Sequence, residues 1–207
     1  EGVSYVIGET HVFTLPQLPT ATVTPIKNEN VTFGLNFKAD EATKEQLFFY
    51  GDWYADFVLT INKDVTFHAD GSGDGWLAGE YGEYGWIKVP YNQTVTLNAG
   101  ESVNIMEKAA QLMGEPGLRY TYAEVYEVVK DFDCGVYFDQ EFLEANPDLE
   151  VTLELRMFDP NHEGVSYVIG ETHVFTLPQL PTATVTPIKN ENLTFGLNFK
   201  ANEATKE

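Results

Sequence analysis

The last 45 residues of the chain repeat its first 45 residues. The two copies, Glu1–Glu45 and Glu163–Glu207, are offset by 162 residues. They differ at two positions, where Val31 becomes Leu193 and Asp40 becomes Asn202. A period of this length far exceeds the 20–50 residues of solenoid repeats and matches the size of one domain with its own core. The sequence therefore predicts a tandem array whose unit is a whole domain.

The composition is that of a folded, strongly acidic domain. Hydrophobic residues make up 43% of the chain and aromatic residues 14%, which is enough to bury a core and excludes disorder. The formal net charge is −20, so contact with nucleic acid or with an anionic membrane surface is not expected. The acidity favours solubility of an abundant surface protein, with cation binding as the alternative.

Cys134 is the only cysteine, so no disulfide can form within the chain. This fits a cysteine-poor bacterial surface protein better than a secreted eukaryotic domain. Its neighbours in DFDCGVYF are largely apolar, which predicts a buried, inert thiol and not a nucleophile. No stretch approaches the ~18–20 apolar residues of a membrane span, so no direct membrane contact is expected.

Most of the period alternates apolar and polar residues, the pattern of strands with one buried face. Val31–Ala39 is the clearest case. The same alternation marks Phe57–Ile61, Val95–Leu97, Val151–Met157 and Ser166–Thr176. Gly170 interrupts the last of these in a predicted turn or bulge. Many short strands separated by turn residues favour a β-sandwich of immunoglobulin-like type.

One helical insertion is expected over about residues 104–145. Met106–Met113 is rich in helix formers and is followed by glycine and proline. Thr121–Glu124 matches a capping box, after which apolar residues recur at helical spacing as far as Phe132. A third short turn is expected over Gln140–Ala145. The predicted fold is therefore mainly β, with helices that protect one end or one sheet edge.

The seam between units is expected in Phe175–Thr182, which matches Phe13–Thr20. Two prolines three residues apart make a short, stiff, extended connector. One complete repeat then spans residues 18–178. Residues 1–17 are the end of a preceding repeat, and 179–207 are the start of the following one.

The two partial repeats contain strands without the rest of their domains. Because isolated strands fray, we expect them to pair with strands of neighbouring identical repeats, in cis or between chains. Pairing between chains would join the molecules into a filament.

Four segments carry a resemblance to known proteins. They are YGDWYADFVLTINKDVTF, IMEKAAQLMGEPGLRYTY, EVVKDFDCGVYFDQEFLEANPDLEVTLELRMF and SYVIGETHVFTLPQLPTATVTP. Together they resemble a tandem repeat of large, adhesin-like surface or secreted proteins of Gram-positive, gut-type bacteria. The resemblance covers essentially the whole period. It implies an extracellular, stalk-like or adhesin-like domain, and it brings no catalytic motif and no role for any single residue.

A calcium site is one interpretation of the motif DGSGDG. Asp70, Ser72 and Asp74 stand at the first three ligand positions of an EF-hand loop, with glycine at the sixth position. The twelfth position is a tyrosine, while Glu80 lies one place early and Glu83 is a further candidate. A plain hairpin turn without metal explains the same residues. The predicted ligands are Asp70, Ser72, Asp74 and Glu80.

The following segment interleaves aromatic residues with glycine and glutamate. Trp76, Tyr81, Tyr84 and Trp86 are the predicted glycan-binding residues, because aromatic rings stack on sugars while carboxylates accept hydrogen bonds from hydroxyl groups. Aromatic residues buried at the end of the sandwich are the simpler alternative.

No catalytic constellation is present in the sequence. It lacks a Ser-His-Asp arrangement, a glycine-rich phosphate loop and zinc-ligand spacing, and nothing singles out a carboxylate pair for glycoside hydrolysis. Lys–Asn cross-links, which some bacterial stalk domains use, are disfavoured because Lys38 lies on the polar side of its strand and Lys63 at a strand end. The predicted function is a non-enzymatic stalk repeat of an extracellular bacterial surface protein. The alternatives are a glycan-binding module with avidity from repetition and a filament subunit.

Overall fold

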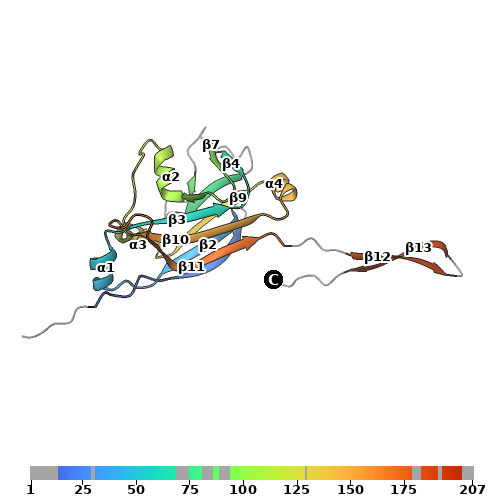
Figure 1. Cartoon of the computed structure of the whole chain (residues 1–207), viewed down its shortest axis with the longest axis horizontal. Coiled ribbons are helices and arrows are strands. Elements are labelled where there is room, and N and C mark those ends of the chain that lie inside the picture. Colours follow the sequence, from blue (N-terminus) through green and yellow to red (C-terminus); the bar gives the residue numbers. More distant parts are fainter. Residues whose placement is uncertain are drawn as a thin grey trace, which may run out of the picture.

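The computed structural model describes residues 14–28, 31–68, 75–80, 86–88, 94–128, 130–178, 183–190 and 193–201. Within these ranges the strands form two sheets that pack face to face, together with a separate hairpin (Figure 1). The fold is mainly β, as the alternation predicts, and its arrangement is that of a β-sandwich. The immunoglobulin-like topology stays a prediction.

The larger sheet, called sheet A, has seven strands. Along the sheet they are β1 (Ala21–Asn28), β2 (Val31–Ala39), β9 (Phe132–Phe138), β5 (Gly75–Glu80), β4 (Val65–His68) and β7 (Thr94–Leu97), while β6 (Trp86–Lys88) also pairs with β5. The pairs are antiparallel except β4–β5, which is parallel. β9 therefore lies in the middle of the sheet, between strands from distant parts of the sequence.

The smaller sheet, called sheet B, has four antiparallel strands. In order they are β11 (Ser166–Thr176), β10 (Glu150–Phe158), β3 (Tyr54–Ile61) and β8 (Ser102–Asn104). The β3–β10 register is continuous from Tyr54 opposite Phe158 to Ile61 opposite Val151. This long ladder fixes the apolar residues of both strands toward sheet A.

The core lies between the two sheets and is rich in phenylalanine. Phe57 of β3 packs against Phe37 of β2 and against Phe132 of β9, with ring centroids 4.9 Å apart in both pairs. Leu35 and Leu155 are fully buried in the same core. Burial of each such side chain contributes roughly 1.5–3 kcal/mol, so the alternation seen in the sequence is the main source of stability.

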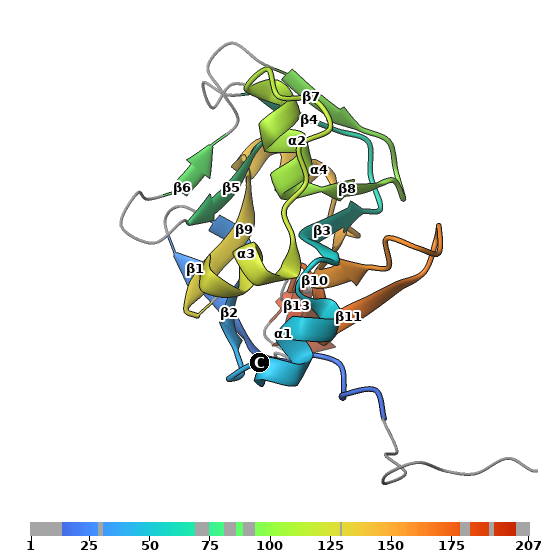
Figure 2. The same ribbon diagram turned by 90° about the vertical axis from the view of Figure 1, so that its left-hand side faces the viewer.

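Four short helices complete the described part of the domain. They are α1 (Lys44–Tyr50), α2 (Ile105–Leu112), α3 (Tyr122–Val128) and α4 (Gln140–Ala145). α2 and α3 lie over β3 (Figure 2). As a result Asp56 and Val58, on the side of β3 turned away from sheet A, are buried as well.

The helical region differs from its prediction in one important respect. The capping box is confirmed, since the N–H of Thr121 donates to the Glu124 carboxylate at 2.8 Å. The helix it begins, however, does not continue to Phe132 but ends at Val128. Phe132 starts β9, whose alternate residues fill the core. Burial in the centre of sheet A outweighs the local helical spacing.

Gly170 lies at a bulge in β11, as the sequence predicts. The β10–β11 register shifts between Leu153 and Leu155, opposite this glycine. Gly170 has a φ of +88°, and a Cβ built on it would lie 2.7 Å from the carbonyl oxygen of Ala21 and 2.8 Å from the Cγ2 of Val23. Only glycine lets β11 approach β1 this closely, so this residue brings the two sheets together along that edge.

The second copy of the repeated segment forms the hairpin of β12 (Ala183–Asn190) and β13 (Leu193–Ala201). Its register runs from Ala183 opposite Ala201 to Asn190 opposite Leu193, and the β1–β2 pair has the equivalent register, irregularity included. Among the described residues β12 and β13 pair only with each other, and Figure 1 shows the hairpin apart from the sandwich. The same sequence thus folds in the same way in two different surroundings.

Candidate functional site

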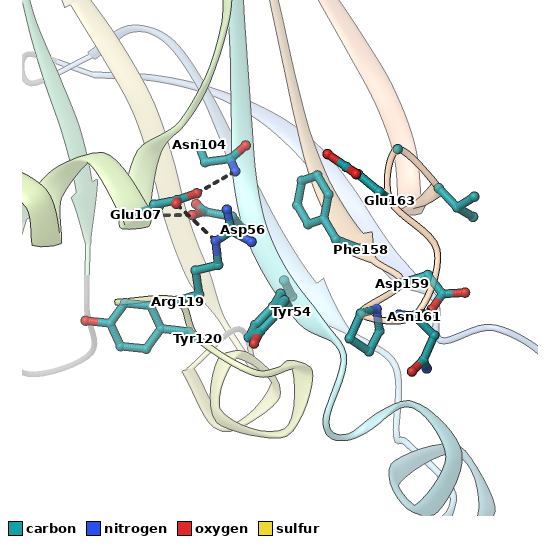
Figure 3. Close-up of a pocket in the computed structure, with 14 residues that line it drawn as sticks. Tyr54, Asp56, Asn104, Glu107, Arg119, Tyr120, Phe158, Asp159, Asn161 and Glu163 are labelled. Atoms are coloured by element: carbon teal, nitrogen blue, oxygen red, sulfur yellow. Dashed lines mark hydrogen bonds and ion pairs between the residues drawn. The ribbon is translucent and has the colours of Figure 1, made fainter. Parts of the chain in front are cut away.

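One described pocket has a volume of about 580 Å³. It lies where β3 and the start of α2 face the turn that follows β10 (Figure 3). Asp56, Glu107 and Arg119 stand on one side of it, and Asp159 and Asn161 on the other. None of these residues was singled out from the sequence as part of a site.

Asp56 caps the first turn of α2 from a different element. Its Oδ1 accepts a hydrogen bond from the N–H of Met106 at 2.8 Å, and its Oδ2 accepts one from the N–H of Glu107 at 2.9 Å. The helix's own N-cap residue, Asn104, makes no capping bond with its side chain. Asp56 therefore satisfies two N–H groups that the helix leaves without partners.

Burial raises the pKa of Asp56 to about 7, from an ordinary value of 3.8. Backbone hydrogen bonds from Met106, Glu107 and Phe57 favour the charged form and limit the rise, and the nearby Glu107 carboxylate adds to it. The loss of hydration is the largest of these effects, because the side chain is enclosed between β3 and α2. A carboxyl with a pKa in this range changes its protonation near neutral pH.

Glu107 and Arg119 form an ion pair at the mouth of the pocket. The Nε of Arg119 donates to Oε1 of Glu107 at 3.0 Å, and Nδ2 of Asn104 donates to Oε2 at the same distance. Burial opposes ionisation of Glu107, but these two hydrogen bonds outweigh it and lower the pKa of Glu107 below its ordinary value. The guanidinium also lies over the ring of Tyr54, 5.5 Å from its centroid.

The opposite side of the pocket is a turn that Asp159 organises. Its carboxylate accepts a hydrogen bond from the N–H of Asn161 at 2.8 Å and contacts Nδ1 of His162 at 2.7 Å. Burial works against the charge, yet these contacts lower the pKa of Asp159. The three carboxylates thus have structural roles: Asp56 caps a helix, Glu107 forms an ion pair and Asp159 holds a turn.

The predicted calcium ligands lie largely outside the described residues. Asp70, Ser72 and Asp74 are among those that the structure does not describe, and for Glu80 it describes only the backbone, at the end of β5. In the described ranges no group of three or more His, Cys, Asp or Glu residues could hold a metal ion. Calcium binding stays a prediction.

The predicted glycan-binding residues are described only in part. Trp76 lies in β5 opposite Tyr137 of β9, and Trp86 lies in β6 opposite Glu80. The structure gives the backbone of Trp76 and Trp86 but not their side chains, while Tyr81 and Tyr84 lie outside the described residues. The pairing of β5 with β6 places Trp86 beside Glu80, four residues along β5 from Trp76, so it does not bring the two tryptophan positions together.

The expectations for cysteine and lysine can be compared directly with the structure. Cys134 is fully buried on β9, and burial raises the pKa of its thiol well above the ordinary value. The prediction of a buried thiol is confirmed. Lys38 is exposed, and Lys63 pairs with Asp148 at 2.7 Å.

The repeated hairpin presents a second candidate surface. In β2, Leu35 and Phe37 are 0% exposed, because β9 and sheet B cover them. Their counterparts in β13, Leu197 and Phe199, are 56% and 66% exposed. The hairpin therefore displays toward solvent the residues that form the core in the first copy. The duplication in the sequence contains this information, but only the structure shows which face is left uncovered.

No described helix has both the length and the apolar character needed to cross a membrane. Neither a protein-family model, nor a curated protein, nor a solved structure matches this chain significantly.

Proposed function

We propose that the chain is a tandem, non-enzymatic stalk repeat of an extracellular, adhesin-like bacterial surface protein. Its role is mechanical: successive identical domains hold a functional head at a distance from the cell. The proposal includes the domain boundaries expected from the sequence, with one complete repeat over residues 18–178.

The observation that carries the proposal is the unequal burial of two nearly identical hairpins. Leu197 and Phe199 of β13 pair with the same positions of their hairpin as Leu35 and Phe37 do, yet no described element covers them. Burial of two such side chains is worth roughly 1.5–3 kcal/mol each. A following copy of the domain would supply the missing covering elements, which are the equivalents of β9 and sheet B.

The path of the chain through the domain agrees with this role. The described chain enters beside α1, and β11 leaves at the opposite end of the sandwich, toward the second hairpin (Figure 1). Domains linked in this way extend in one direction, and do not fold back on each other. The extracellular location is supported by the resemblance of the sequence, and the single cysteine fits a bacterial surface protein better than a secreted eukaryotic domain.

The test is to complete the second repeat. The chain is extended by a copy of residues 46–178 placed after Glu207, and hydrogen exchange is compared between the extended and the original protein. In the original protein we expect the amides of β12–β13 to exchange much faster than those of β1–β2, because only the latter lie in a packed sheet. In the extended protein both hairpins should be equally protected. A hairpin that stays unprotected after extension contradicts the repeat proposal.

The exposed face of β13 also favours a second function, that of a filament subunit joined by strand exchange between chains. In that case the β12–β13 hairpin of one molecule occupies the place of β1–β2 in another. Sedimentation at rising protein concentration separates the two proposals. A filament subunit associates in the full chain and not in a chain that ends at Pro178, whereas a stalk repeat is monomeric in both.

A further inference from the structure

The proline-rich connector occurs twice in the chain, and each copy contacts a different side of a domain. In the first copy the connector is held by the domain that follows it. The hydroxyl of Tyr50 donates to the carbonyl oxygen of Pro16 at 2.8 Å, and Nε2 of Gln46 donates to that of Gln17 at 3.1 Å. Leu18 packs against the core, and Pro19 is buried. From Pro16 onward, therefore, the connector is part of the following domain.

In the second copy the connector is held by the domain that precedes it. Phe175 and Leu177 pack against the core, and the ring of Phe175 lies 5.3 Å from that of Phe33. The next residue, Pro178, is exposed. As far as Leu177, therefore, the connector is part of the preceding domain.

In each copy, the connector residues on one side of the Leu–Pro peptide bond are packed and those on the other side begin exposed, and the packed side differs between the two copies. Leu15, the counterpart of Leu177, is 75% exposed, because no complete domain precedes it. Pro178 is exposed while its counterpart Pro16 is half-buried against α1. When the two copies are combined, the connector is held by the preceding domain as far as Leu177 and by the following domain from the position of Pro16 onward. The change of domain falls between Leu177 and Pro178, so the boundaries of the complete repeat move from the expected 18–178 to residues 16–177.

We propose that successive repeats are joined without a free linker residue and dock directly, end to end, through α1 of the following domain. This inference rests on the proposed function and specifies how its units are held in line. The occupant of the docking surface is a second copy of this domain.

The docking surface on the following domain is an apolar patch on α1, made of Phe48 and Phe49. Phe48 is 82% exposed and Phe49 is 42% exposed, with their rings 5.3 Å apart. Tyr50 and Gln46 of the same helix hold the connector, so α1 is the element to which the preceding domain is attached. Phe48 and Phe49 are the exposed apolar residues of this seven-residue helix. Adjacent Cα atoms are ~3.8 Å apart, so a single peptide bond between the packed residues forces the two domain ends into contact.

The peptide bond at the joint is itself restrained. Proline fixes its own φ near −65° and disfavours helical backbone in the leucine before it. The joint therefore has few accessible conformations even before the two surfaces meet. Little conformational entropy opposes docking, and a modest apolar contact is enough to hold it.

The experiment measures whether two linked domains tumble together. The chain extended by residues 46–178 contains two complete repeats and one complete joint. We expect its NMR rotational correlation times to be equal in both domains and clearly longer than in the 207-residue chain. Small-angle scattering should give a single elongated particle.

The variants weaken the docking surface in the second repeat. Phe48→Ser with Phe49→Ser in the appended copy should shorten the correlation time of the second domain toward the value of a single domain. Tyr50→Phe in the same copy should act in the same direction, since it removes the hydroxyl that holds the connector. The matched control places Phe48→Ser and Phe49→Ser in the first repeat, which no complete domain precedes, and should leave the joint unchanged.

The outcomes separate this inference from the proposed function. Two folded domains that tumble independently in the extended protein without substitutions overturn direct docking and leave the tandem repeat intact. A second period that fails to fold, seen as unprotected amides throughout, overturns the repeat proposal itself. If the paired serine substitutions change the correlation times equally in either repeat, Phe48 and Phe49 stabilise the domain that contains them. That result also overturns the docking surface.

Discussion

At the scale of single residues, the buried carboxyl of Asp56 links the stability of the domain to pH. Its pKa is raised in the folded state, to about 7, above the 3.8 of an exposed aspartate. Between pH 3.8 and about pH 7, therefore, the folded protein holds a proton on Asp56 that the unfolded chain has released. The stability contribution is fully present below about pH 4 and is lost as pH rises through 7.

Asp56→Asn tests this relation, because asparagine does not titrate. The difference in unfolding free energy between the original protein and the variant should fall as pH rises from 4 to 7, by at most about 1.4 kcal/mol per pH unit. Urea denaturation at several pH values measures it. The comparison with the variant removes the opposite contributions of Glu107 and Asp159, whose pKa values are lowered. A difference that does not change with pH contradicts the raised pKa.

Tyr122 carries a hydroxyl that folding leaves without a partner. The side chain is fully buried, and its oxygen makes no hydrogen bond with any residue that the structure describes. An unsatisfied buried hydroxyl costs roughly 1–3 kcal/mol, so Tyr122→Phe should preserve or raise the melting temperature. Tyr122→Ala, which also removes the ring, should cost roughly 3–5 kcal/mol. A clear loss of stability in the phenylalanine variant would mean that the hydroxyl has a partner.

At the scale of elements, Gly170 decides whether β11 can lie against β1. Alanine at this position combines an unfavourable positive φ with contacts of 2.7 and 2.8 Å to Ala21 and Val23. We expect Gly170→Ala to destabilise the domain by about 2 kcal/mol, measured by thermal denaturation. Gly164→Ala is the matched control, since it also has a positive φ but meets nothing within 4 Å. Similar losses in both would show that strain at φ matters and the close approach does not.

The two hairpins offer a second comparison at this scale. Phe37→Ala removes a ring from the core and should cost roughly 3–5 kcal/mol. Phe199→Ala changes the same position of the second copy, where the ring is exposed, and should leave the main unfolding transition of the 207-residue chain unchanged. A large loss from the second substitution would place β13 inside a core after all.

The elements differ in how far their sequences predict them. Strands that bury one face, such as β2 and β10, follow from alternation because each carries its own pattern. β9 alternates as well, but its first residue, Phe132, also continues the helical spacing of the residues before it, so the sequence reads equally as the end of a helix. Its place in the middle of sheet A depends on pairing with β2 and β5, which lie far from it in the sequence. α1 was missed although Thr43 and Gln46 form a capping box that the sequence contains. The pocket was missed because Asp56 meets α2 only through the tertiary fold.

At the scale of the whole molecule, the duplicated segment says more about how the domains are arranged than the amino-acid composition does. The sequence shows that the segment is repeated but not which of its faces is covered in each copy. That distinction depends on β9 and on strands β3, β8 and β10 of sheet B, which belong to the part of the period that occurs only once in the chain. The proposed docking of one repeat on the next likewise rests on a comparison of the two copies of the connector in three dimensions.

β1 and β11 also determine how a tandem array would respond to tension. Gly170 lies close to Ala21, and Phe175 lies close to Phe33 near the far end of β1, so the first and last strands run side by side in the same direction. A force applied to the two ends would shear β1 along β2 and β11 along β10. The interstrand hydrogen bonds of each pair would then carry the force together and would not break one after another. In an array whose repeats match over their whole length as the 45 duplicated residues do, each repeat would resist the same force. No repeat of such a tether would be weaker than the others, and a single-molecule pulling experiment should show a series of unfolding steps at similar forces.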